Sequence, residues 1–111
     1  MKLKDIIEKM DLKVLSGQDK LECDVTGGYT SDLLSDVIAN SKEGNLWITL
    51  QTHQNIIAVA KLKDLAGIII INNREPDEDT LTKAKEENVP VLCSQEMAFV
   101  VSGKLYKLAS S

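Results

Sequence analysis

The stretch LWITLQTHQNIIAVA, residues 46–60, decides the fold of this 111-residue chain. Its first five residues are apolar enough to predict a strand, and the polar residues 51–55 that follow predict a loop and helix start. The apolar spacing over residues 56–62 predicts a helix, with Thr52 as a plausible N-cap. A strand, a polar loop and a helix in this order are typical of an α/β domain.

Strand and helix continue to alternate along the chain on both sides of this stretch. The run AGIIII, residues 66–71, is continuous and β-branched, which is typical of a central strand covered on both faces. The remaining predicted elements, in order, are a strand over residues 21–26 broken by Gly27 and Gly28, a helix around residues 33–38 that Gly44 ends, a helix from Pro76 to residue 87, a strand over residues 89–93, and a short helix that Ser94 caps and Gly103 stops.

The first twenty residues read as a helical extension packed on the rest. Leu3, Ile6, Ile7 and Met10 fall on one stripe of a short helix, and residues 13–15 predict a brief strand. We expect one domain over residues 1–111, with right-handed crossovers and therefore a mostly parallel sheet. The fold class predicted is a three-layer α/β/α sandwich.

Composition excludes several classes of function. Thirteen basic residues against seventeen acidic ones give a net charge of −4, with no cluster of Lys and Arg for nucleic acid. Neither a signal peptide nor a membrane span is visible, so we expect a cytoplasmic protein. Cys23 and Cys93 fall in predicted strands without metal-ligand spacing, which predicts reduced thiols and neither a metal nor another cofactor.

Polar side chains follow the predicted strands, where the carboxyl ends of parallel strands would gather them at one edge of the sheet. Such an edge could recognise a small polar ligand, since helix N-termini also present free N–H groups there. An equally physical alternative is that these residues only cap helices and satisfy the backbone. The candidate ligand-binding residues are Gln51, Thr52, His53, Gln54, Asn55, Asn72, Asn73, Arg74, Ser94, Thr30 and Asp32.

Catalytic motifs are largely absent from the sequence. There is no GxxxxGK[ST], GxGxxG, GxSxG or HExxH pattern, so nucleotide hydrolysis, hydride transfer, elbow-serine hydrolysis and zincin chemistry have no signature. Cys93 ends a strand and His53 is the sole histidine, but neither has an evident activating partner. We therefore expect no enzyme and rank a small enzyme using His53 or Cys93 as the weakest hypothesis.

Four segments carry a family resemblance: GGYTSDLLSDV, LWITLQTHQNIIAVA, AGIIIINN and VPVLCSQEMAF. Taken in order, they resemble the DRTGG domain family, in particular its small stand-alone members. Similar domains accompany phosphotransacetylases and CBS-containing pyrophosphatases, and they resemble the N-terminal domain of HPr kinase/phosphorylase. The positions matching the Asp-Arg and Thr-Gly-Gly residues that name the family are 52–53 and 71–73, where this chain departs from the pattern.

The resemblance implies an HPr kinase N-terminal-domain-like fold and a role in regulation, ligand sensing or subunit contact. Our leading hypothesis is a non-catalytic module, a homodimer, that binds a small polar ligand or a protein partner at the strand-end loops. The alternative is a structural interaction subunit whose functional surface is an exposed apolar helix face.

Overall fold

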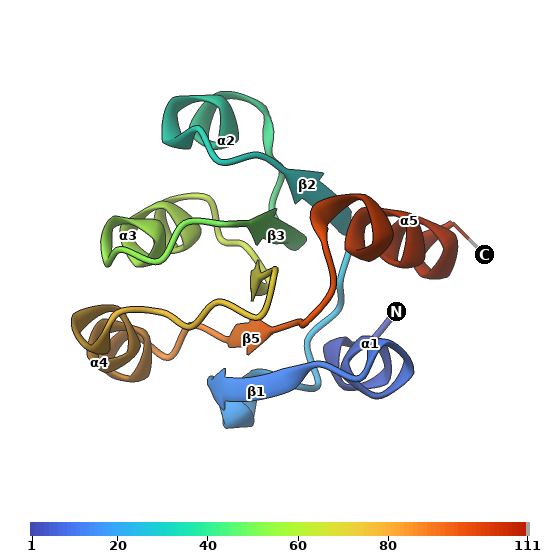
Figure 1. Cartoon of the computed structure of the whole chain (residues 1–111), viewed down its shortest axis with the longest axis horizontal. Coiled ribbons are helices and arrows are strands. Elements are labelled where there is room, and N and C mark those ends of the chain that lie inside the picture. The colour runs from blue at the N-terminus through green and yellow to red at the C-terminus, as the bar shows by residue number, and fades with distance from the viewer. Residues whose placement is uncertain (111) are drawn as a thin grey trace.

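A computed structural model describes residues 1–110 and contains a five-stranded sheet between two layers of helices (Figure 1). The strand order is β1-β5-β4-β3-β2, and only the β1–β5 pair is antiparallel. The predicted α/β/α sandwich with a mostly parallel sheet is confirmed. The elements are α1 Leu3–Met10, β1 Lys13–Ser16, the 3-10 helix Gln18–Lys20, β2 Gly27–Thr30, α2 Leu34–Asn40, β3 Asn45–Thr49, α3 Asn55–Leu62, β4 Gly67–Ile70, α4 Glu78–Glu87, β5 Val91–Cys93 and α5 Ala98–Ala109.

The helices divide between the two faces of the sheet. Figure 1 shows α2, α3 and α4 side by side on one face, with α1 and α5 on the other. Each parallel crossover from β2 to β5 passes through the first group, which is the arrangement that right-handed β-α-β connections produce. The chain ends, α1 and α5, supply the second layer.

β3 and β4 form the centre of the sheet because both of their faces are apolar. Every residue of both strands is buried. Trp47, Ile68 and Ile70 pack with α3 and α4 on one side, whereas Ile48 and Ile69 pack with α1 and α5 on the other. Burial on both faces explains why these strands are continuous apolar runs in the sequence.

The N-terminal segment contributes a strand as well as a helix. Leu3, Ile6 and Met10 bury one stripe of α1 against the sheet. The brief strand predicted at residues 13–15 is β1, which pairs antiparallel with β5, with a register irregularity between Val14 and Ser16. The first twenty residues thus complete one edge of the sheet.

The strand expected over residues 21–26 was wrong, because β2 is Gly27–Thr30. The earlier residues turn back toward α1, with the amide of Leu3 donating to the carbonyl of Cys23 at 3.0 Å. Gly28 lies in the strand, paired with Leu46 of β3, and a Cβ there would lie 2.5 Å from Cδ2 of Leu105 in α5. Gly28 therefore serves close packing against Leu105, and the glycine pair does not terminate a strand.

Helix ends also differ from expectation. Gly103 does not stop the last helix, which runs on to Ala109, because Val101 and Leu105 on either side of it are packed in the core and keep this segment helical. Thr52 does not cap α3, whose N-cap is Gln54, and α4 starts at Glu78 rather than at Pro76. The loop after β4 is therefore longer than predicted, because Pro76 and Asp77 belong to it and not to α4.

Candidate functional site

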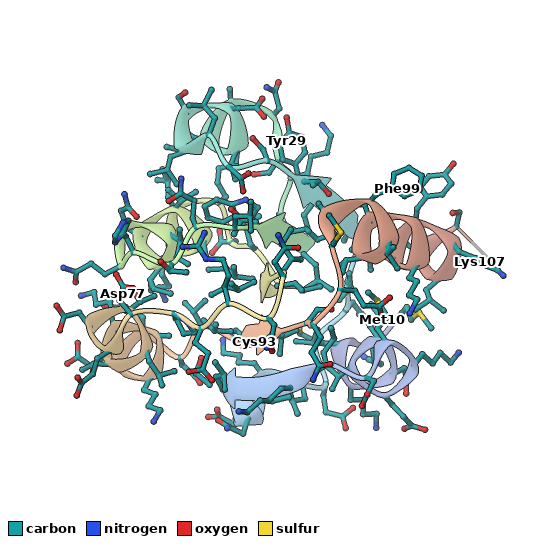
Figure 2. All side chains as sticks on the ribbon, viewed as in Figure 1. Met10, Tyr29, Asp77, Cys93, Phe99 and Lys107 are labelled. Carbon is teal, nitrogen blue, oxygen red and sulfur yellow. The ribbon has the colours of Figure 1, made fainter. Side chains whose placement is uncertain are left out.

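The carboxyl ends of the parallel strands carry three long polar loops and a short turn at one edge of the sheet (Figure 2). The loops are residues 31–33 after β2, residues 50–54 after β3, residues 71–77 after β4 and residues 94–97 after β5. Backbone hydrogen bonds link neighbouring loops in series: the amide of Ile71 donates to the carbonyl of Thr49 at 3.1 Å, and that of Asn73 donates to Ser94 at 2.9 Å. The predicted site segments are therefore adjacent.

Asp32 joins the loop after β2 to the loop after β3. Its Oδ1 accepts hydrogen bonds from Oγ1 of Thr49 at 2.9 Å and from the backbone amide of Leu50 at 2.7 Å. In return, Nε2 of Gln51 donates to the carbonyl of Asp32 at 2.8 Å. Three hydrogen bonds fix the two loops to each other, and they use Oδ1 of Asp32 and Nε2 of Gln51.

The loop after β3 is also joined to the start of α4. The carbonyl of Thr52, a buried residue, accepts from the amide of Asp77 at 3.0 Å and from Oγ1 of Thr80 at 2.6 Å. Above this joint, Nδ1 of His53 lies 2.8 Å from Oδ2 of Asp77, with both side chains at least half exposed. The side-chain partner of His53 is thus Asp77, the residue that precedes α4.

The loop after β4 turns sharply at two asparagines. Asn72 and Asn73 have φ values of 60° and 57°, the left-handed region that asparagine tolerates better than most residues. Their amides donate to the carbonyls of Glu96 and Ser94, each at 2.9 Å. Buried Ser94 itself accepts from the amide of Glu96 through Oγ at 3.1 Å. The backbone bonds hold both asparagine side chains outward.

Six exposed polar side chains, on these loops and at the first residue of α3, have no hydrogen-bond or ion-pair partner within residues 1–110: Gln54, Asn55, Asn72, Asn73, Arg74 and Gln95. Two neighbouring acidic side chains, by contrast, lie beside lysines. Glu75 lies 4.0 Å from Lys13, and Glu96 accepts from Lys104 at 2.6 Å. The arrangement leaves amides and one guanidinium available on a framework that is tied together beneath them.

Thr30 lies at the carboxyl end of β2, but its side chain contacts α5 and not the other candidate residues. Its Oγ1 lies 2.7 Å from Oγ of Ser102 in α5, on the opposite helical layer. It lines a groove of about 490 Å³ between β2 and α5, together with Gly27, Gly28, Leu105 and Tyr106. Sequence reasoning missed the α5 side of this groove because it ended the helix at Gly103. The one available signal was the Gly27-Gly28 pair.

Neither thiol is activated for nucleophilic chemistry. Burial raises the pKa of the Cys93 thiol, and the charge of Glu75 adds to the effect. Burial likewise raises the pKa of Cys23, which lies in a loop rather than in the predicted strand. Among the described residues, no group of three or more His, Cys, Asp or Glu side chains is placed to hold a metal ion, and no helix is long and apolar enough to cross a membrane.

Comparisons with known proteins agree with this architecture. A search of curated proteins finds no match. The fold is similar to the CBS and DRTGG domains of the regulatory region of a Clostridium perfringens pyrophosphatase, solved with its activator diadenosine tetraphosphate, at a TM-score of 0.71 and 13% identity. That match covers 95% of this chain but 46% of the other, so this chain spans less than half of that structure. The family model of the DRTGG domain matches residues 5–108, and the chain therefore belongs to the DRTGG domain family.

Proposed function

We propose that this protein is a non-catalytic regulatory module that senses a small anionic ligand at the loops following β3 and β4. The observation that carries the proposal is the row of unpartnered side chains, Gln54, Asn55, Asn72, Asn73 and Arg74, on loops already tied together beneath them. A binding site whose framework is fixed in advance loses less conformational entropy on binding. Membership of a family found in a pyrophosphatase regulatory region supports a regulatory role.

The available groups favour an anion. Arg74 carries a guanidinium without an ion-pair partner in the described part of the chain, and such a group binds phosphate or carboxylate in a bidentate manner. At the N-terminus of α3, the amides of Ile56 and Ile57 donate to the carbonyls of His53 and Gln54, so the amides of Gln54 and Asn55 are the donors left unpaired there within residues 1–110, beside a favourable helix dipole. Amide side chains on Asn72 and Asn73 supply further donors. Phosphorylated metabolites and nucleotides are therefore the ligands to test first.

The test is a thermal-shift and calorimetric screen of the full chain with inorganic phosphate, AMP, ATP and diadenosine tetraphosphate. We expect at least one probe to stabilise the wild-type protein. Arg74→Ala should lower the affinity for that probe about tenfold or more, because a hydrogen bond to a charged group contributes about 1.5–3 kcal/mol. Lys107→Ala, which removes the same charge from the far end of α5, is the matched control and should bind as wild type (Figure 2).

The asparagines need a different substitution. Alanine at position 72 or 73 would add strain in the left-handed region, whereas glycine removes the amide without it. Asn73→Gly should therefore weaken binding while the protein stays folded. Absence of stabilisation by every probe, in a wild-type protein that captures no partner, would contradict the proposal.

A second candidate function is a structural interaction subunit. It is favoured by large apolar side chains on the surface, of which Phe99 is 91% exposed and Tyr106 is 75% exposed. Loop substitutions distinguish the two functions. In a ligand-sensing module they should abolish the response to ligand, whereas in a structural subunit they should change only stability. The proposal also includes the dimeric, cytoplasmic state that the family resemblance and the composition imply.

A further inference from the structure

The two edges of the sheet are protected differently. An edge strand presents unpaired backbone groups, which proteins usually guard with charge, proline or a bulge. β1 has both a lysine, Lys13, and a register irregularity between Val14 and Ser16. β2, with the sequence GGYT, has neither charge nor proline, and its register to β3 is regular over all four residues. The β2 edge is therefore open to a further strand.

The groove beside this edge is uncharged. None of the residues that line its 490 Å³ between β2 and α5 is acidic or basic, although 27% of the chain is charged. Two copies of a chain with a net charge of −4 repel each other over most of their surfaces. A neutral face is where such copies can approach most closely.

Apolar side chains flank the open edge on both layers of helices. On one layer, α5 exposes Phe99 and Tyr106, seven residues apart and thus on one helix face. Figure 2 shows Phe99 on the side of α5 nearest β2, pointing away from the rest of the protein. On the other layer, Leu33, which precedes α2, is 64% exposed, and Ile38 within it is 40% exposed. One interface could cover both sets.

We infer that a second copy of this chain docks here, with the two β2 strands pairing antiparallel about a two-fold axis perpendicular to the sheet. That axis preserves the faces of the sheet, so α5 of one protomer meets α5 of its partner, and α2 meets α2. Four-residue strands alone bury far less than the roughly 800 Å² per partner of a stable complex, and the flanking helices supply the remainder. The inference rests on the dimeric state proposed above and assigns its surface.

An extended peptide is the competing occupant of this surface. A single added strand would satisfy the β2 backbone and place side chains in the groove below α5. It would, however, leave Ile38 and Leu33 on the opposite layer exposed. A second copy buries the apolar side chains of both layers at once, which is why the observations favour it.

Sedimentation of the full chain with three single substitutions tests the inference. Tyr106→Asp on α5 and Ile38→Asp on α2 should each raise the dimer dissociation constant about tenfold or more, because each places like charges across the axis. Leu62→Asp, at a 66% exposed position in α3 away from this edge, adds the same charge and should leave the dimer unchanged. All three positions are exposed, so folding should be retained.

Hydrogen exchange supplies the second measurement. Backbone amides of residues 27–30 should exchange more slowly as the concentration of the wild-type protein is raised. A dimer that survives both Tyr106→Asp and Ile38→Asp, or that loses affinity through Tyr106→Asp alone, would overturn the assigned surface while leaving the dimeric state intact. A wild-type protein that is monomeric throughout would overturn the dimeric state and the surface together, without affecting the ligand proposal.

Discussion

Nδ1 of His53 lies 2.8 Å from Oδ2 of Asp77, and this contact joins the loop after β3 to the residue that precedes α4. The backbone amide of the same Asp77 donates to the carbonyl of Thr52. The exposed side-chain contact therefore adds to a backbone hydrogen bond that already joins the same two segments. The aspartate contacts Nδ1 of the imidazole, and Nε2 has no partner among residues 1–110.

Replacing Asp77 by asparagine should change the free energy of unfolding by less than about 1 kcal/mol, because exposed ion pairs contribute little. Urea unfolding measures this change. Thr80→Val, which removes the buried hydroxyl that donates to Thr52, should cost about 0.5–1.5 kcal/mol, since the Thr52 carbonyl loses one of its two donors and keeps the Asp77 amide. If the two variants lost the same free energy of unfolding, the His53–Asp77 contact would hold the loops together as strongly as the buried hydrogen bond does.

Asp32→Ala should destabilise the protein by about 1–3 kcal/mol, since the carboxylate accepts from both Thr49 and the Leu50 amide. Asp32→Asn keeps one acceptor oxygen and should lose less. The two variants are compared by chemical denaturation at constant pH. A loss as small as that of an ordinary surface substitution would show that the loops hold together without this side chain.

Two glycine substitutions should have opposite signs. Gly28→Ala should cost about 1–3 kcal/mol, because its Cβ would lie 2.5 Å from Cδ2 of Leu105 and this buried side chain would have to leave its packed position. Gly103→Ala should stabilise by about 0.5–1 kcal/mol, because an added Cβ meets nothing within 4 Å and alanine favours the helix. Thermal unfolding of the two variants checks both signs, and a stabilising Gly28→Ala would contradict the packing of α5 on β2.

The Tyr29–Asp36 pair gives a prediction about pH. Oη of Tyr29 donates to Oδ1 of Asp36 at 2.7 Å and lowers the pKa of that carboxyl, with Ser31 and Asn40 adding to the effect. A pKa below the unfolded value contributes stability that is present at neutral pH and lost as the pH falls through the folded pKa. Tyr29→Phe should raise the Asp36 pKa toward its ordinary value, and carboxyl NMR titration measures it. An unchanged Asp36 titration would assign the shift to the other two partners.

The centre of the sheet was predictable from the sequence and its β2 edge was not. The apolar runs at residues 46–50 and 66–71 predict β3 and β4, because a strand buried on both faces requires a continuous apolar sequence. GGYT carries no such pattern, since β2 is set by pairing with β3 and by the close approach of Leu105. Tertiary packing of this kind has no local signature.

The candidate site was also predictable only in part. Its position at the strand ends follows from parallel topology, so Gln51 and Asn72 could be placed on one edge before the structure was known. The contact of His53 with Asp77 could not, because it depends on where α4 begins. Pro76 suggested a helix start that the structure places two residues later, at Glu78. Thr30 was assigned to the edge, but its side chain contacts Ser102 on the other layer.

Two-dimensional amide NMR of the uniformly labelled chain, titrated with diadenosine tetraphosphate and separately with inorganic phosphate, tests the central claim most directly. The account predicts saturable shifts that centre on Gln54, Asn55 and residues 72–74 and that Arg74→Ala reduces. Shifts confined to the groove between β2 and α5, or spectra that neither probe changes at millimolar concentration, would contradict it.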